Sequence, residues 1–162
     1  MFFRIKKIKG NEYVYIVENE WKAKGSRQKV KGYVGRSYRF ALKNEVDFLQ
    51  FMKIESLESY INSSEKHKVI TDLVEWEMFK FGISRQEFSI DLSNRVIQKN
   101  SKNVVFLVNE GFMCGVTLEN LLGFKATGDE QADAHLLARA LVEAGIKVPN
   151  EVFIGLYGNL KK

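Results

Sequence analysis

The sequence predicts an α+β fold: an N-terminal three-stranded antiparallel sheet, helices, a second short β-ribbon and a C-terminal three-helix segment. Three observations predict it: residues 2–36 mix cations with β-branched and aromatic residues, residues 65–81 place apolar residues at helical spacing, and residues 86–115 return to short apolar runs separated by turn residues. At 162 residues and 45% hydrophobic content, the chain is long enough to bury a core. We expect a basic sheet in residues 1–40 and a mixed helical and ribbon region in residues 41–162, either separate or packed together as one domain.

The first three expected strands follow one another closely. FFRIKKIK begins at residue 2, and EYVYIVE follows at residues 12–18 with apolar side chains on both faces, as in a central strand. Gly10 and Asn11 stand where a two-residue hairpin loop requires positive φ. A polar connection ending at Gly25 leads to SRQKVKGYVGR, the third strand, which we expect to end near Gly35. Three strands with a helix packed on one face can be stable, whereas two alone are marginal in water.

The next segment reads as helical. FALKNEVDFLQF at residues 40–51 has a loosely helical pattern, and a second short helix is expected over residues 54–60. A longer helix over residues 65–81 has a broad apolar arc that Glu77 interrupts, and Gly82 can end it in the left-handed conformation. The candidates for its N-cap are Asn62, Ser63 and Ser64.

A second ribbon is expected before the last helices. FSIDL at residues 88–92 alternates apolar and polar residues, and the run Val104–Val108 is continuously apolar. The turn formers after that run are Asn109, Glu110 and Gly111.

Three helices are expected after residue 116. Thr117 begins the helical stretch TLENLLGF, and Thr127 with Glu130 fits a capping box for a second helix, which Gly145 ends. Pro149 suits the first turn of a last helix that runs through Leu160.

The positive charge lies at the N-terminus. Residues 1–43 hold 12 Lys or Arg and 3 acidic residues, a balance of +9, whereas the remaining 119 residues hold 13 basic and 17 acidic residues, a balance of −4. A dense basic cluster attracts polyanions, because neutralising phosphates releases their condensed counterions. The asymmetry therefore favours a nucleic-acid partner over a solvated face that has no partner.

The third strand shows how such a surface could form. Alternate side chains of a strand point to opposite faces, so Arg27, Lys29 and Lys31 would share one face while Val30 and Val34 turn toward a core. Aromatic rings beside cations can also stack on unpaired bases, although core packing or covering of the hairpin are alternative roles for these rings. The predicted nucleic-acid-binding residues are Lys6, Lys7, Lys9, Tyr13, Tyr15, Trp21, Arg27, Lys29, Lys31, Arg36 and Arg39.

Two stretches, RIKKIKGNEYVYIVEN at residues 4–19 and SRQKVKGYVGR at residues 26–36, carry a resemblance. Together, over about residues 3–37, they resemble the opening of a group of insertion-sequence transposases and related archaeal proteins, in which a basic strand precedes an RNase H-like catalytic domain. The resemblance implies that this segment holds nucleic acid.

The resemblance does not extend to catalysis. The transposase core places three carboxylates on a mixed sheet to bind two metal ions. Here the aspartates fall mostly in helical or capping contexts and not at the ends of apolar strands: Asp47, Asp72, Asp91, Asp129 and Asp133. We therefore expect a shared binding ribbon without cutting or joining activity.

Other chemistry finds little support in the residues. The single Cys114 leaves no disulfide within the chain and no thiol pair for zinc, and neither phosphate-binding glycine loops nor metal-ligand spacings occur. No apolar run reaches the roughly 18 to 20 residues that cross a bilayer. We expect a cytoplasmic, non-enzymatic nucleic-acid-binding protein without cofactor or metal and without a membrane partner. The alternative is a protein-interaction module, or a subunit of a larger assembly, that binds its partner through the C-terminal helices.

Overall fold

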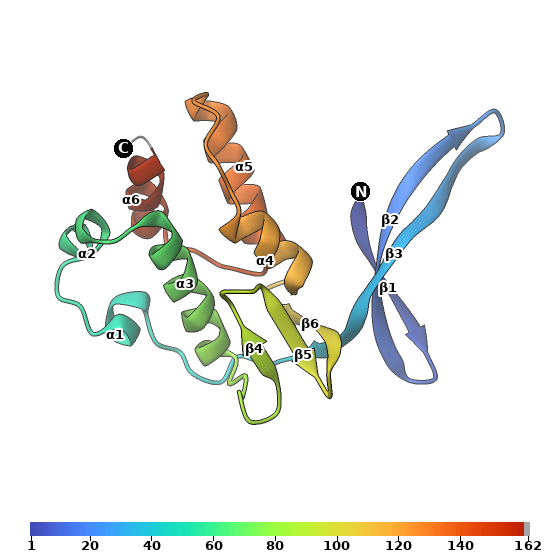
Figure 1. The fold of residues 1–162 in the computed structure, drawn as a ribbon, viewed down its shortest axis with the longest axis horizontal. Helices are drawn as coiled ribbons and strands as arrows, with labels where there is room; N and C mark the ends of the chain where they lie inside the picture. The colour runs from blue at the N-terminus through green and yellow to red at the C-terminus, as the bar shows by residue number, and fades with distance from the viewer. Residues whose placement is uncertain (161–162) are drawn as a thin grey trace.

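The computed structural model describes residues 1–160, in which seven strands and six helices form a mixed α and β fold (Figure 1). The strands are β1 Phe2–Ile8, β2 Asn11–Lys22, β3 Gly25–Arg39, β4 Ser89–Asp91, β5 Val96–Lys99, β6 Lys102–Val108 and β7 Gly111–Met113. The helices are α1 Phe48–Met52, α2 Leu57–Ser63, α3 Lys66–Lys80, α4 Gly115–Leu122, α5 Glu130–Glu143 and α6 Asn150–Leu160.

All seven strands belong to one sheet with the order β1-β2-β3-β6-β5-β4, in which β7 also pairs with β6. The antiparallel meander β1-β2-β3 is confirmed. The end of β3 pairs in parallel with β6, from Arg36 opposite Val104 to Arg39 opposite Leu107. The later strands are therefore joined to the first sheet through β6 and do not form a separate ribbon.

The first turn lies one residue earlier than the sequence predicts. Ile8 pairs with Asn11, so the two loop residues are Lys9 and Gly10, with φ of 50° and 81°. Two successive positive φ values are typical of the hairpin turn that matches the twist of its strands. Lys9 consequently lies in the turn and not on a strand face.

A long hairpin projects from the rest of the molecule. The segment expected to be a polar connection is strand almost throughout, because Lys22 pairs with Gly25 across a two-residue turn. Since β1 pairs only with residues 11–17 of β2, residues 18–29 form a two-stranded ribbon, here called the hairpin arm. Figure 1 shows this arm extending away from the helices.

Two irregularities break the expected alternation in β3. The pairing with β2 skips Val34 and Lys31, each of which is an extra residue at a bulge. Val34 therefore joins the buried side with Val14 and Val105 in a small core. A strictly alternating strand could not place residues in this way, and the glycines beside each bulge, Gly32 and Gly35, favour such a distortion.

The helix expected over residues 40–51 is short. Residues 40–47 have no helix, because the backbone N–H groups of Lys43 and Asn44 donate to the Lys80 carbonyl at 2.8 and 2.9 Å instead of to their own segment. Helix α1 begins only after Asp47, whose carboxylate accepts from the Gln50 N–H at 2.8 Å. It packs near α3 and not on the N-terminal sheet.

The long helix α3 lies close to its predicted bounds, but its N-cap differs. Glu65 occupies the cap position without a side-chain hydrogen bond, whereas Ser63, one of the expected caps, belongs to α2. Its end is as predicted. Gly82 has φ of 63°, and the N–H groups of Gly82 and Ile83 return to the carbonyls of Phe79 and Met78, both at 3.0 Å.

The C-terminal helices pack on different neighbours. Helix α4 begins two residues before Thr117 and packs on α3 and α5, whereas α6 packs mainly on α2 and α3. The N-cap of α5 is Asp129, whose carboxylate accepts from the Ala132 N–H at 3.1 Å. The carboxylate that accepts from the backbone N–H groups of Thr127 and Gly128 is that of Asp133 and not that of Glu130, as the expected capping box would have it. Gly145 ends α5 with φ of 76°.

Two cores hold the fold together. The larger one surrounds α3 and the central strand β6, with Leu73, Phe106 and Leu141 fully buried. The smaller one lies under β1–β3, where the rings of Phe3 and Phe112 stack with centroids 4.8 Å apart. Among the helices of residues 1–160, none combines the length and the apolar character needed to cross a membrane.

Candidate nucleic-acid interface

The register of β1–β3 divides their side chains between two faces. Glu12 and the residues at alternate positions from it, Val14 through Lys22, lie on one face of β2, and Tyr13, Tyr15 and their alternates lie on the other. We call the first the glutamate face, because it carries all three acidic residues of β1–β3: Glu12, Glu18 and Glu20. We call the second the tyrosine face; its charged residues and tyrosines near β1 are Arg4, Lys6, Tyr13, Tyr15, Tyr33 and Arg36.

Cations on the glutamate face are countered by carboxylates of the same chain. Lys31 lies 2.8 Å from Glu18, and Arg39 contacts both carboxylate oxygens of Glu12, at 2.7 and 3.1 Å. The hydrogen bonds and charges of Lys31 and Arg39 hold the pKa values of Glu18 and Glu12 below their ordinary range. This face is therefore a mixture of both signs and not a continuous positive surface.

Arg27 and Lys29 share that environment. Arg27 is opposite Glu20 and Lys29 is opposite Glu18 in the register of the hairpin arm. Opposite charges on directly paired residues attract one another across an antiparallel pair. The cations that first suggested a binding strand are thus placed beside the chain's own acidic groups.

The tyrosine face carries cations without acidic residues of β1–β3 beside them. Two rows cross the sheet on it: Lys6, Tyr13 and Arg36 are aligned in one row, and Arg4, Tyr15 and Tyr33 in the next. None of the acidic residues of β1–β3 lies on this face. Within residues 1–160, no ion pair joins Arg4, Lys6 or Arg36 to a carboxylate.

Neutral partners hold these cations in place. The Lys6 ammonium lies 4.7 Å from the centroid of the Tyr15 ring, and Arg36 donates to the Asn11 side-chain oxygen at 2.8 Å. Arg4 donates to the Gln28 side chain. Because contacts with a ring or an amide leave the full positive charge, these groups remain able to bind an anion.

Three tyrosines form a cluster between the cations. The Tyr33 ring lies 5.2 Å from that of Tyr15 and 6.4 Å from that of Tyr13, centroid to centroid, with tilts of 53° and 45°. Tyr33 is 58% exposed, whereas the other two are half-buried. Partial burial raises the pKa of the Tyr33 phenol above its ordinary value.

The predicted residues are divided between the two faces. The tyrosine face receives Lys6, Tyr13, Tyr15, Trp21 and Arg36, and the glutamate face receives Lys7, Arg27, Lys29, Lys31 and Arg39. Sequence reasoning missed two members of the tyrosine face, Arg4 and Tyr33. Glu12, Glu18 and Glu20 are separated by even numbers of residues along one strand, and this is the signal that could have separated the faces.

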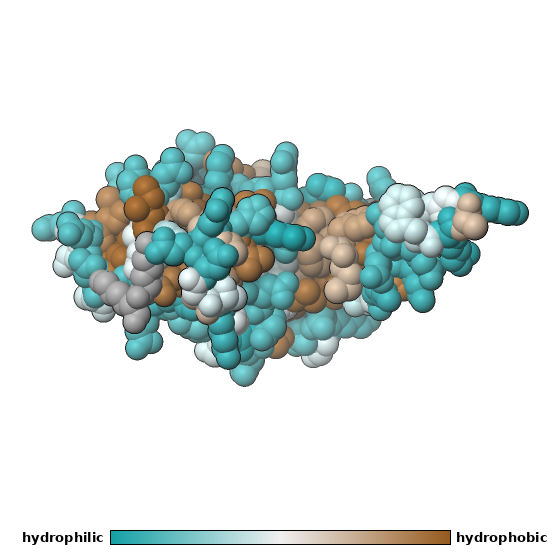
Figure 2. Space-filling view, turned by 90° about the horizontal axis from the view of Figure 1, so that it is seen from above, coloured by the Kyte–Doolittle hydropathy of each residue, from teal (hydrophilic) through white to brown (hydrophobic). Residues whose placement is uncertain are grey.

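The hairpin arm presents polar surface and one large ring. Figure 2 shows hydrophilic residues over much of the arm at the right, and apolar residues where the sheet meets the helical part. Trp21 is 81% exposed, and its pairing partner is Ser26. This indole is therefore available to an external partner.

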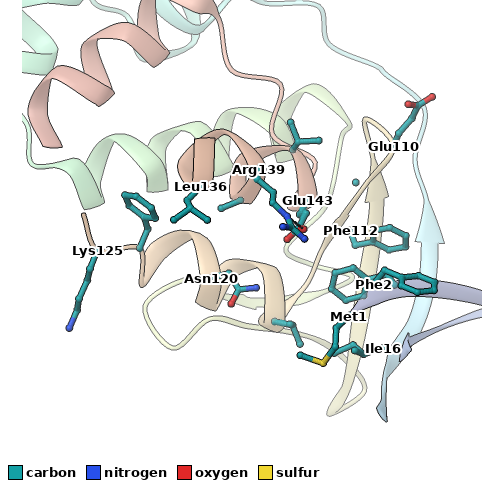
Figure 3. Close-up of a pocket in the computed structure, with 16 residues that line it drawn as sticks. Met1, Phe2, Ile16, Glu110, Phe112, Asn120, Lys125, Leu136, Arg139 and Glu143 are labelled. Atoms are coloured by element: carbon teal, nitrogen blue, oxygen red, sulfur yellow. Dashed lines mark hydrogen bonds and ion pairs between the residues drawn. The ribbon is translucent and has the colours of Figure 1, made fainter. Parts of the chain in front are cut away.

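A separate apolar cleft lies between β1 and helices α4 and α5. Its volume is about 750 Å³, and its lining includes Phe2 and Phe112 together with Leu136 and Arg139 of α5 (Figure 3). Arg139 and Glu143 form an ion pair at 2.9 Å on its wall. Within residues 1–160, no group of three or more His, Cys, Asp or Glu side chains could hold a metal ion.

Comparison of the chain with protein-family models, with curated proteins and with solved structures finds no match.

Proposed function

We propose that this protein is a non-enzymatic nucleic-acid-binding protein whose contact surface is the tyrosine face. The observation that carries the proposal is the charge of that face: Arg4, Lys6 and Arg36 stand on it without any acidic residue from β1–β3. Phosphates supply most of the affinity of such complexes, because each contact releases counterions. The resemblance of residues 3–37 to the opening of insertion-sequence transposases supports the same partner.

The salt dependence of binding tests the proposal. Three phosphate contacts give a slope of log affinity against log salt of about −2 for single strands and about −3 for duplex DNA. The affinity for a single strand then falls roughly 20-fold between 50 and 200 mM salt. Fluorescence anisotropy with labelled 20-residue oligonucleotides measures both quantities.

Matched double variants test which face binds. Lys6→Gln with Arg36→Gln removes two cations of the tyrosine face, so the single-strand slope should fall to about −0.7. The control, Lys31→Gln with Arg39→Gln, removes the same residue types from the glutamate face, where they are paired with Glu18 and Glu12. We expect the control to keep the wild-type slope. Absence of salt-sensitive binding by the wild type, or an equal loss in the control, would overturn the proposal.

A second function, protein binding, is favoured by the cleft beside α4 and α5. Exposed apolar side chains border it, among them Leu136 and Val142, which are 45% and 66% exposed. Such a surface fits a protein-interaction module or a subunit of a larger assembly. Size-exclusion chromatography with light scattering separates the two functions, since a monomer that binds oligonucleotides needs no protein partner.

A further inference from the structure

We infer that the tyrosine face selects unpaired nucleotides over duplex, with Tyr33 as the ring on which a base stacks. The inference rests on the proposed function and names the class of nucleic acid that the same surface binds. Three features of the face carry it: the exposed ring of Tyr33 within the tyrosine cluster, two rows in which tyrosines lie beside cations, and the absence of acidic residues of β1–β3 from that face.

The exposed ring is held in a defined place. Tyr33 contacts the rings of Tyr15 and Tyr13 on one side, and it stands on β3 beside the bulge at Val34. Bulges re-aim side chains and are frequent next to functional sites. A ring supported by two others loses little conformational freedom when a base stacks on it, which favours binding.

The cations are placed to hold the backbone of a strand whose base covers Tyr33. Lys6 lies over Tyr15, and Arg36 follows Tyr33 on the same strand and is oriented by Asn11. Both therefore border the ring cluster on opposite strands of the sheet. A positive groove that follows phosphates, combined with rings that stack on bases, is how single strands are bound without a sequence requirement.

A duplex presents no free base face on which Tyr33 could stack. Its bases stack on one another inside the helix, so a solvent-exposed ring can reach only sugar and phosphate, and the tyrosines then add nothing beyond the charge of the cations. Unpaired DNA and unpaired RNA both present a free base face and a phosphate, which is the chemistry recognised here. We therefore expect the tyrosine face to discriminate between single strands and duplexes more strongly than between DNA and RNA.

Four probes of equal length separate base stacking from charge: a 12-residue oligo(dT), a 12-residue oligo(U), an abasic 12-residue strand and a 12-base-pair DNA duplex. Wild-type protein should bind oligo(dT) and oligo(U) about 5- to 100-fold more tightly than the abasic strand, the range that one stacked base supplies. Equal binding of the abasic and base-bearing strands would overturn the inference.

Variants at Tyr33 test the ring itself. Tyr33→Leu should lower oligo(dT) affinity by the same factor and leave abasic-strand and duplex affinities unchanged, whereas Tyr33→Phe keeps the ring and should bind like wild type. Phe79→Leu is the matched control, because Phe79 is an exposed ring (46%) on α3, remote from the sheet face. Unfolding curves of each variant verify that the fold is retained.

The outcomes separate this inference from the proposed function. If Tyr33→Leu leaves oligo(dT) binding unchanged while the Lys6 and Arg36 double variant still reduces it, the stacking inference fails and charge-based binding stands. If no probe binds in a salt-sensitive way, the proposed function fails as well.

Discussion

Replacement of Glu77 should destabilise the protein strongly, because this carboxylate is fully buried in α3 and accepts three hydrogen bonds. The donors are the Lys80 ammonium at 3.1 Å, the Asn109 amide at 2.8 Å and the Lys147 backbone N–H at 2.9 Å. The contacts join α3 to the β6–β7 turn and to the segment after α5. Lys80 also lies 3.6 Å from the centroid of the Trp76 ring and is only 12% exposed.

The size of the effect follows from the groups left without a partner. Glu77→Leu leaves the nearly buried Lys80 ammonium without its carboxylate and the Lys147 N–H without an acceptor, while the Asn109 amide keeps only its bond to the Gly145 carbonyl; the cost is about 3–5 kcal/mol in unfolding free energy. In a domain of this length, that corresponds to a decrease in Tm of roughly 6–20 °C. Glu77→Gln keeps one acceptor and turns an amide N–H₂ toward Asn109, so the cost should be smaller, about 1–3 kcal/mol.

Urea unfolding, followed by tryptophan fluorescence, measures the free energy differences, provided that the m-value is unchanged. Glu75→Gln is the control on the same helix: its exposed ion pair with Arg85 should contribute at most about 1 kcal/mol. A Glu77→Leu variant that is as stable as wild type would show that the three contacts do not hold the fold.

Three further outcomes are expected. Hydrogen bonds from the Thr127 and Gly128 N–H groups hold the pKa of Asp133 below its ordinary value, so their stabilising effect is complete above the unfolded-state pKa and is lost as pH falls through the lower folded-state pKa. The difference in stability between wild type and Asp133→Asn, measured by urea unfolding, should be constant near pH 6 and shrink below about pH 4. Gly35→Ala should cost about 1–3 kcal/mol, seen as a lower urea midpoint, because an added Cβ would lie 2.4 Å from the Asn103 carbonyl oxygen where β3 meets β6. Trp21→Phe should leave the urea midpoint within about 0.5 kcal/mol of wild type, since the indole is 81% exposed.

Local signals predicted the parts of the fold that depend on local chemistry. Gly82 and Gly145 both end helices in the left-handed conformation, as their positions indicated. The meander β1-β2-β3 also follows from its residue pattern. By contrast, the pattern at residues 40–51 suggested a helix that forms only over α1, because the preceding backbone bonds to the end of α3. The pattern of residues 40–51 cannot indicate this bond, because the acceptor, the Lys80 carbonyl, lies 36 residues after Asn44 in the sequence.

The candidate site shows the same division. Its residue types, cations beside tyrosines in the first 40 residues, are visible in the sequence. Which cations remain unpaired depends on register. The first bulge in β3 moves Tyr33 onto the tyrosine face, and the second restores the original alternation before Arg36. The glutamates of β2 are separated by even numbers of residues, which indicates that they share one face. The indication is correct because both bulges add their extra residue to β3 and none to β2.

The sequence by itself determined where positive charge gathers, which glycines end helices and which segments are extended, because each depends on residues a few positions apart. Tertiary structure alone decided that β3 pairs with β6, that Glu77 is buried with three donors, and that Arg4, Lys6 and Arg36 lie on the face opposite the carboxylates of β1–β3. These properties require groups distant in sequence to meet, and pairing register fixes which groups meet.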